Sequence, residues 1–455
     1  MGIRNKLYSS NFLSLLFEKR SIAPLVLFRI IFGCMMFIST LRFWYNGWID
    51  ALFIQPRNFF HYYGFEWVKP LDENLIYLVF SLLLISSLSI ALGLFYRFST
   101  LLFFLLFTYT ELIDLTNYLN HYYFVSLIAF LMCLLPANRF LAIDVWIKPR
   151  IANLKTANWT IWILKFQIGL VYLFAGIAKL NKDWLFDAMP MSIWLQAKTY
   201  WPVVGALFAE KWIAYGASWM ACFFDLFIVF FLMSRRTRPL AYFVLIIFHV
   251  ITGLMFPIGM FPWIMILSTL IFFSEEFHQK IIAFIATIFR SKKKDIKKNT
   301  PYKLKNYKKI LVSSFLCGYV LFQLLFPFRY LFYPGDLFWT EQGYRFSWRV
   351  MLMEKAGTAF FYVTDPTTGM KGEVDNSDFL TVTQEKMMAT QPDMILQYAK
   401  MIKKEVESRG LKDPIINAEV YVTLNGSRSK LFIDPDINLL ELEDDFNHKH
   451  WILEN

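Results

Sequence analysis

The sequence predicts a polytopic α-helical membrane protein with about nine transmembrane helices and a C-terminal extracytoplasmic α+β domain. Of its 455 residues, 57% are hydrophobic, 19% are aromatic and only 18% are charged, whereas about a quarter of a soluble domain is charged. The apolar residues gather in blocks of about 17 to 22, the length that a helix needs to cross a hydrocarbon core of about 30 Å. These blocks outweigh the two or three soluble domains that chain length alone would suggest.

Nine apolar blocks mark the expected spans, and the fourth and eighth are short. Their boundaries carry an error of several residues, as is usual for such patterns. The blocks cover residues 22–40, 74–95, 99–117, 121–136, 159–179, 215–233, 238–255, 259–274 and 309–327.

Basic residues between the blocks set the expected orientation. They lie before the first block and after the second, fourth, sixth and eighth, which places them all on one side of an alternating chain. Lysine and arginine concentrate in cytoplasmic loops, so this side is expected to face the cytosol and the C-terminus the outside. The expected division is a cytoplasmic segment at 1–20, a helical membrane domain at 21–330 and an extracytoplasmic domain at 331–455.

The net charge of +11 does not indicate a nucleic-acid-binding protein. From residue 327 onward there are 14 Lys and Arg against 20 Asp and Glu, and the rest of the chain has 32 against 15. The positive excess therefore lies in short loops between apolar blocks, as topology-setting charge does, and not along one binding face.

Histidine and cysteine patterns predict neither a metal site nor disulfides. The six histidines show no ligand spacing, and all four cysteines lie inside apolar blocks. The sequence also has no glycine-rich phosphate loop and no Gly-x-Ser-x-Gly element.

The C-terminal region carries both strand and helix patterns. Apolar residues alternate at 345–353 and 359–364, which predicts two strands, the second followed by a turn. Residues 392–408 carry apolar side chains at helical spacing. Asn425 and Gly426 stand between two further strand segments and predict a type I′ hairpin turn.

Ionisable side chains gather near the predicted outer ends of the spans. Charged groups inside a span are costly and are functional candidates by default. Glu111 and Asp114 are three residues apart and share one helix face. The other members of this outer layer are Asn120, His121, Lys179 and His249.

Each of these residues has a structural alternative. Lys179 could be an interfacial lysine that reaches the headgroups beside an aromatic-belt residue, Trp184. The histidines could be hydrogen-bonded packing residues, and the two carboxylates could cap or pair locally.

Several segments together carry a resemblance to a known family. The segment with the strongest resemblance is 167–184, which contains Ala-Gly-Ile-Ala-Lys-Leu ending at Leu180. The other segments occur along the chain in the order expected for the family, at 27–33, 77–80, 92–97, 120–123, 248–249, 257–261, 339–340 and 346–348. The chain resembles the vitamin K-dependent γ-glutamyl carboxylases and, more broadly, their bacterial relatives with an HTTM domain. The resemblance covers about residues 20 to 455.

The resemblance implies an activity and roles for single residues. Family members couple oxidation of a reduced naphthoquinone by O₂, which gives its epoxide, to removal of a γ-proton from glutamate, and the carbanion captures CO₂. Lys179 corresponds to the lysine that acts as base, and His121, after Asn120, to the histidine that stabilises developing charge. His249 matches a family histidine, although residues 250–253 lack the polar run of vertebrate members.

Elementary chemistry suits such a site. An exposed lysine is charged at neutral pH, whereas a low-dielectric environment disfavours the ammonium and leaves an amine that can act as a base. Exclusion of water protects reactive intermediates and strengthens electrostatic interactions. Trp339, Trp348 and Arg349, just past the last span, are expected to form the roof of the site. Together with Asn120 and His249 they are expected to bind quinol or substrate.

The expected function is therefore that of a peptidyl-glutamate 4-carboxylase-like lyase. Its expected cofactor is reduced vitamin K (menaquinol or phylloquinol), with O₂ and CO₂ as co-substrates and no metal. The expected partners are the lipid bilayer, a membrane-borne quinol and a secreted Glu-containing peptide or protein, without nucleic acid, and the expected location is a bacterial plasma membrane. Two alternatives remain: a quinol epoxidase or oxidase without glutamate carboxylation, and a non-enzymatic transporter or lipid-binding scaffold, for which paired broken helices would be expected.

Overall fold

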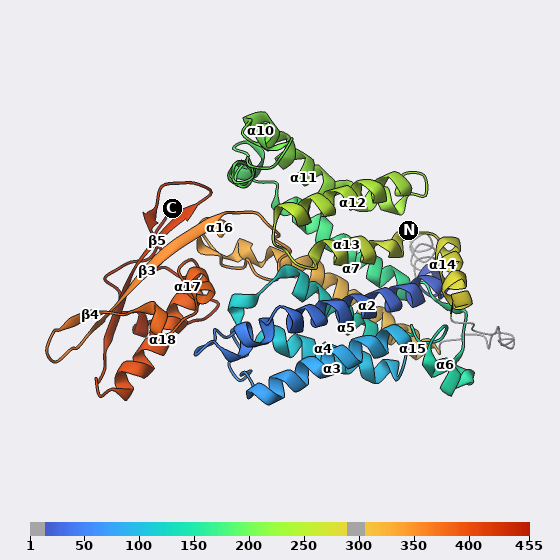
Figure 1. Cartoon of the computed structure of the whole chain (residues 1–455), viewed down its shortest axis with the longest axis horizontal. Helices are drawn as coiled ribbons and strands as arrows, with labels where there is room; N and C mark the ends of the chain where they lie inside the picture. Colours follow the sequence, from blue (N-terminus) through green and yellow to red (C-terminus); the bar gives the residue numbers. More distant parts are fainter. Residues whose placement is uncertain (1–13, 289–304) are drawn as a thin grey trace, which may run out of the picture.

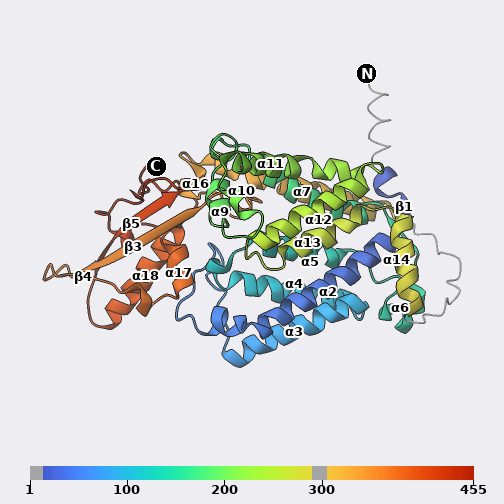
Figure 2. The same cartoon turned by 45° about the horizontal axis from the view of Figure 1, so that its top comes forward.

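The computed structural model describes residues 14–288 and 305–455. They form a helical bundle with a smaller domain of sheet and helices at one end (Figure 1 and Figure 2). The predicted α-helical fold with a C-terminal α+β domain is confirmed. The basic residues at 292–298, which follow the eighth apolar block, and most of the N-terminal segment at 1–20 lie outside the described residues.

Helices occur at all nine predicted spans. In the described segments, six are long and apolar enough to cross a membrane, and two others are apolar but shorter. The number nine therefore stays a prediction. The six long helices are α2 (Ala23–Tyr45), α3 (Glu73–Leu92), α7 (Trp159–Ala178), α11 (Lys211–Met233), α12 (Arg238–Met255) and α15 (Asn306–Leu325) with η5 (Phe326–Phe332). The two shorter apolar helices are α5 (Asn120–Leu134) and α13 (Phe261–Ser268) with η4 (Thr269–Phe272). The predicted span at 99–117 corresponds to α4 (Tyr96–Leu112).

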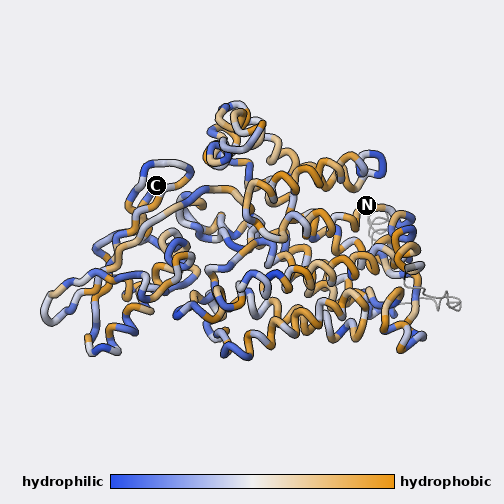
Figure 3. The backbone as a smooth tube through the Cα atoms, viewed as in Figure 1, coloured by the Kyte–Doolittle hydropathy of each residue, from blue (hydrophilic) through white to orange (hydrophobic). Residues whose placement is uncertain are grey.

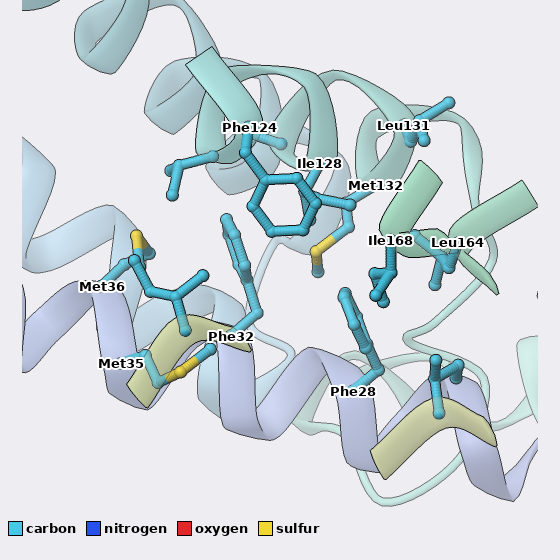
Figure 4. Close-up of a cluster of buried hydrophobic side chains, with 14 of the residues drawn as sticks. Phe28, Phe32, Met35, Met36, Phe124, Ile128, Leu131, Met132, Leu164 and Ile168 are labelled. Carbon is cyan, nitrogen blue, oxygen red and sulfur yellow. The ribbon is translucent and has the colours of Figure 1, made fainter. Parts of the chain in front are cut away.

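One apolar core runs through the helical bundle. Side chains of α2, α5 and α7 interdigitate there, as the close-up in Figure 4 shows. Their dense packing fixes the relative positions of these three helices. The labelled members are Phe28, Phe32, Met35, Met36, Phe124, Ile128, Leu131, Met132, Leu164 and Ile168.

The outer faces of several helices are apolar and uncovered. In the most apolar stretches of α11, α12 and α15, only 33%, 28% and 22% of the residues are buried. Hydrophobic colour runs along the helices of the bundle, and hydrophilic colour gathers at its ends and in the C-terminal domain (Figure 3). Large exposed apolar surfaces of this kind are stable when lipid covers them, so the chain is a membrane protein.

The C-terminal domain is built on a four-stranded antiparallel sheet in the order β4-β3-β5-β6. Its two long strands, β3 (Lys355–Thr364) and β5 (Ile415–Leu424), pair along their whole length, with Lys355 opposite Leu424. The short outer strands are β4 (Lys371–Glu373) and β6 (Lys430–Leu431). Alternate residues of β5 are buried, as expected for a strand with one face on a core.

Two helices complete this domain, α17 (Val382–Met388) and α18 (Pro392–Ser408). The helix predicted at 392–408 is confirmed. The hairpin turn is also confirmed, because Asn425 and Gly426 have φ values of 50° and 75°, and Ser427 N donates to the carbonyl of Leu424.

The strand predicted at 345–353 is wrong. This segment is an irregular loop in which Phe346, Trp348 and Met351 have φ values of 58°, 58° and 49°. Its alternating apolar side chains enter the helical bundle instead of lining a sheet. Phe346 contacts the ring of Tyr118, and Trp348 stacks on Tyr123 with ring centroids 4.8 Å apart.

Hydrogen bonds of two glutamine side chains join the two domains. Gln384 of α17 donates to Asp114 Oδ2 at 3.0 Å and to the carbonyl of Asn58 at 2.7 Å. Gln397 of α18 accepts from the backbone N–H of His61 at 2.8 Å and donates to its carbonyl at 2.9 Å. The C-terminal domain is therefore fixed on the end of the bundle.

Candidate active site

Lys179 lies at the C-terminal end of α7, and its side chain turns into the protein. Its Nζ donates to Asp225 Oδ2 of α11 at 2.8 Å and to the carbonyl of Ala175 at 3.2 Å. Only 5% of Lys179 and 6% of Asp225 are exposed. The two form an ion pair shielded from solvent, which costs desolvation energy and is strongly coupled.

The alternative interpretation of Lys179 as an interfacial lysine is wrong. Trp184, expected to belong to an aromatic belt, is buried as well, and its Nε1 donates to the carbonyl of Ser218 at 2.8 Å. The Lys179 Nζ lies 5.2 Å from the centre of its ring, within the range of a cation–π contact.

A glycine allows α7 and α11 to approach at this point. A Cβ at Gly176 would lie 2.7 Å from the backbone nitrogen of Leu226, so only glycine fits. Small residues at helix contacts permit such close backbones in membranes. The approach brings Asp225 within reach of Lys179, one helical turn after Gly176.

A second buried pair lies deeper along α7. The hydroxyl of Tyr172 and Nε2 of His249 are 2.7 Å apart, and the other ring nitrogen of His249 is buried without a hydrogen-bond partner. Tyr172 precedes Lys179 by seven residues, about 10 Å along the helix at 1.5 Å per residue. Phe224, next to Asp225, contacts the Tyr172 ring, so both pairs share the interface of α7 and α11.

His121 joins this region through an aromatic side chain. The ring of Phe261 lies 5.7 Å from that of His121 and 5.8 Å from that of His249. The structure thus gathers the two predicted histidines around one phenylalanine, with the Lys179 pair nearby on α7.

The predicted roof residues take different positions. Asn120 donates to the backbone carbonyl of Arg349 at 2.9 Å, which holds Arg349 beside the helix that carries His121. Trp348 is buried against the bundle. Trp339 lies in the core of the C-terminal domain, where its Nε1 donates to the carbonyl of Leu453 at 2.7 Å, away from the histidines.

The two predicted carboxylates stand apart from Lys179. Asp114 caps the short helix η2 (Leu115–Asn117) by accepting from the backbone N–H of Thr116 at 2.9 Å, and it also binds Gln384. Glu111 lines a separate cavity of about 30 Å³, room for roughly one or two waters. The alternative interpretation of Asp114 as a residue that caps a neighbouring helix is confirmed.

Asp225 was not among the residues predicted from the sequence. It is the only Asp, Glu, Lys or Arg in the apolar block 215–233, and a charged residue inside a span is a sufficient signal for a functional candidate. Nothing in the sequence indicated that Asp225 pairs with Lys179, because the two residues lie 46 positions apart on different helices.

A cavity of about 200 Å³ opens on the other side of the Lys179 segment. Its walls come from the end of α7, from η5, from α16 (Leu337–Thr340) and from the loop after it. Arg349 lines the cavity with a guanidinium 4.4 Å from the centre of the Tyr330 ring, and its Nε–H has no partner. Burial lowers the pKa of Arg349, although the Tyr330 hydroxyl opposes this shift.

Among the described residues, no three His, Cys, Asp or Glu side chains are grouped as metal ligands would be.

Comparison with known proteins covers almost the whole chain. Residues 17–277 match the model of the HTTM domain, and residues 308–455 match the model of the lumenal domain of vitamin K-dependent gamma-carboxylase. No solved structure matches the chain. The resemblance inferred from single motifs is confirmed: this protein belongs to the vitamin K-dependent gamma-glutamyl carboxylase family.

Proposed function

We propose that this protein couples O₂-dependent epoxidation of a reduced naphthoquinone to carboxylation of glutamate side chains in a secreted peptide or protein. The observation that carries the proposal is the buried pair of Lys179 and Asp225, at the position where the family has its base. Family membership supports a vitamin K-dependent carboxylase in general, and the roles of single residues are proposed here.

The pair provides a base without exposing it to water. Transfer of one proton across the 2.8 Å between Lys179 Nζ and Asp225 Oδ2 converts the ion pair into an amine and a carboxylic acid. In an apolar interior the neutral pair avoids the desolvation cost of two charges. The free amine of Lys179 then takes the proton of the substrate hydroxyl, and Asp225 retains the first proton.

The residues around His249 fit a reduced naphthoquinone. Its buried Nδ1 lacks a partner, and the rings of Phe224, Phe248 and Phe261 surround it. Such a site offers apolar contact to the rings and one hydrogen-bonding group to a hydroxyl. Bound there, reduced vitamin K would supply the oxidation energy and, after reaction with O₂, the strong base for the glutamate γ-proton.

The histidines stabilise negative charge as it develops. The Tyr172 hydroxyl fixes the orientation of the His249 ring, as a hydrogen-bonded partner does for a catalytic imidazole. His121 faces the same region across Phe261 and is proposed to act on the carboxylation step. A water-poor environment strengthens both contributions.

The proposed orientation places the C-terminal domain outside the cytosol, in a bacterial plasma membrane. α6 (Ile143–Ile147) and α14 (Glu275–Ile288) lie at the opposite end of the bundle (Figure 1 and Figure 2). Lys148, Arg150 and Lys155 follow α6, which favours that end as the cytoplasmic one. An apolar quinol would then enter from lipid and a peptide from the outer aqueous side.

Lys179→Ala tests the proposal. Purified full-length protein is given reduced vitamin K and O₂, and the epoxide is measured. A base contributes about 10²- to 10⁴-fold, so we expect a loss of at least about 100-fold. Lys182→Ala removes an exposed lysine three residues away and should retain the parent rate. Epoxide formation by Lys179→Ala at the parent rate would refute the assignment.

A second candidate is epoxidation without carboxylation, suggested by the missing polar run at 250–253. The structure weakens this argument, because Val250 and Ile251 are 38% and 47% exposed on the outer face of α12. Incubation with ¹⁴C-bicarbonate and Glu-containing peptides separates the two candidates, since only a carboxylase fixes the label.

A further inference from the structure

A segment of short helices leaves the bundle between the end of α7 and the start of α11. It contains α8 (Lys182–Leu185), α9 (Met191–Gln196) and α10 (Gly205–Phe208), and none of these is long enough to cross a membrane. In Figure 1, α10 projects to one side of the bundle, beyond α11 and toward the end that carries the C-terminal domain. Alternation of the predicted spans at 159–179 and 215–233 would leave this segment in water.

The tip of this segment, residues 199–209, is apolar and uncovered. It contains no charged residue. Val203 is 98% exposed, and Tyr200 and Leu207 are exposed as well. Water is a poor environment for apolar side chains that gather in this way, so the tip is an interaction surface.

The tip adjoins the lipid-facing side of α11. Trp212, Tyr215 and Trp219 follow one another at helical spacing in the first half of α11, and all three are exposed. The Tyr215 hydroxyl donates to the carbonyl of Phe186 at 3.0 Å, and Trp219 Nε1 donates to the carbonyl of Leu185 at 2.9 Å. Trp and Tyr side chains favour the level of the lipid headgroups, so the segment leaves α11 at the membrane boundary.

The segment is folded, so the protein itself sets the position of the tip. The ring of Trp201 packs on that of Phe208 with centroids 5.9 Å apart, and the backbone N–H of Gly205 donates to the carbonyl of Trp201 at 3.0 Å. Trp194 of α9 donates to Glu354, the residue before β3, at 2.7 Å. Backbone groups that are bonded within a segment can enter apolar surroundings at low cost.

We propose that residues 199–209 insert into the lipid leaflet on the side of the C-terminal domain, as a shallow anchor that does not span the membrane. An anchor of this kind lies about 5–10 Å into the boundary between headgroups and acyl chains. Lys198 precedes the tip, and the exposed pair of Glu210 and Lys211 follows it. The Lys198 ammonium lies 5.9 Å from the centre of the Tyr200 ring, and a lysine there can reach a lipid phosphate while its stem stays in apolar surroundings.

Continuity and charge favour lipid over a protein partner. The tip adjoins the part of α11 that the bilayer covers, so lipid can cover both surfaces without a break. Lipid phosphates are negatively charged and complement the two lysines that flank the tip. A second copy of this chain is the other apolar partner, and a label on the tip distinguishes the two.

Insertion of the tip holds the end of α7 at the membrane boundary. The segment begins directly after Lys179, and Leu180 and Phe186 are its first exposed large apolar residues. Because Trp194 also bonds Glu354, one anchor sets the height of Lys179 and of the C-terminal domain together. This inference does not depend on the reaction that the protein catalyses.

The test locates a spin label in full-length protein reconstituted in vesicles of phosphatidylcholine and phosphatidylglycerol. Val203→Cys carries the nitroxide, in a protein whose exposed Cys34 and Cys317 are replaced by alanine. We expect the label to collide with O₂, which partitions into lipid, more than with a water-soluble nickel complex. Its depth should be about 5–10 Å below the phosphates.

Two exposed positions serve as controls for the label. Phe223→Cys, near the middle of α11, should report lipid at greater depth, and Met370→Cys, in the turn between β3 and β4, should report water. Preferential collision of the Val203→Cys label with the nickel complex would refute the proposal. Access by neither reagent would refute it too, because protein and not lipid would then cover the tip.

A charge at the tip gives a second measurement on the same element. With the label at Leu207→Cys, Val203→Asp should move the label toward water, because an unpaired carboxylate is costly in apolar surroundings. Val203→Leu, which keeps an apolar side chain, should leave the label in lipid. The same label depth in Val203→Asp and Val203→Leu would contradict insertion of the tip.

Discussion

Gly176 lies against the backbone of Leu226, with room for no side chain between the two helices. This contact sets the distance between α7 and α11. This distance determines whether the Asp225 carboxylate comes within hydrogen-bonding distance of Lys179 Nζ, because the two residues lie on different helices.

Gly176→Ala should therefore separate the helices and break the ion pair. Overpacking of a filled interface costs about 1–3 kcal/mol, so we expect a lower melting temperature in detergent and loss of most epoxidation. Gly216→Ala, on the same pair of helices but with open space around its Cα, is the control and should change neither property. Full activity of Gly176→Ala would show that the close approach is not needed.

Asp225→Asn should inactivate the protein and destabilise it. Removal of one partner of a buried ion pair costs about 3–5 kcal/mol, and an amide at this position cannot take and retain the proton of Lys179 as the Asp225 carboxylate does. The double variant Lys179→Met, Asp225→Leu removes both charges and should recover stability, measured by thermal unfolding, without recovering epoxidation. A double variant that is active would exclude Lys179 as the base.

Tyr172→Phe should leave both nitrogens of the His249 ring without a partner in the buried aromatic cluster. An unsatisfied buried group costs about 1–3 kcal/mol, and the ring loses its fixed orientation. We expect a reduced kcat for epoxidation with the protein still folded. Tyr242→Phe removes a comparable hydroxyl, which donates to the carbonyl of Ile266 at 3.1 Å, and should affect stability without the same loss of kcat. Equal losses of kcat in the two variants would contradict a role for His249.

The C-terminal domain should loosen in acid through Asp393. Burial raises the pKa of this carboxyl, but the charge and hydrogen bonds of Arg345 outweigh burial and hold it below its usual value. Its folded-state pKa is depressed, so the stabilisation is complete above about pH 4 and is lost as pH falls through the lower folded value. The protection of the α18 amides, measured as their hydrogen exchange relative to the intrinsic rate at the same pH, should fall as the pH is lowered below about 4.

Asp393→Asn should abolish most of this acid dependence. Asp413→Asn, which replaces an exposed carboxylate in the loop between α18 and β5, should keep it. A pH profile unchanged by Asp393→Asn would assign the acid response to other groups.

Local patterns predicted the helices and the hairpin because both depend on residues near in sequence. The helix at 392–408 and the turn at Asn425 and Gly426 follow from spacing and from backbone preference. The prediction of a strand at 345–353 was wrong because an alternation of apolar and polar residues shows only that every second side chain is buried. It does not show that the burial occurs in a sheet. Phe346 and Trp348 meet that requirement by entering the bundle.

Some residues of the candidate site could be predicted from the sequence, but their arrangement could not. Lys179, His121 and His249 could be named because charged or polar groups in spans are rare. The contacts between these residues and their partners depend on which helices pack together. The spacing of apolar residues along one sequence does not reveal which helices are neighbours. The Lys179–Asp225 and Tyr172–His249 pairs join residues 46 and 77 positions apart.

The hydrogen bond between Asp114 and Gln384 bears on how the protein is made. Its two partners are separated by 270 residues, and a ribosome needs on the order of tens of seconds to add that length at about 5–20 residues per second. During that interval the buried carboxylate, at the end of the bundle that carries the C-terminal domain, accepts from the backbone N–H of Thr116 but still lacks the amide of Gln384. Chains that end before residue 384 keep this defect permanently, so truncated products should be cleared as unfinished instead of accumulating as stable helical cores.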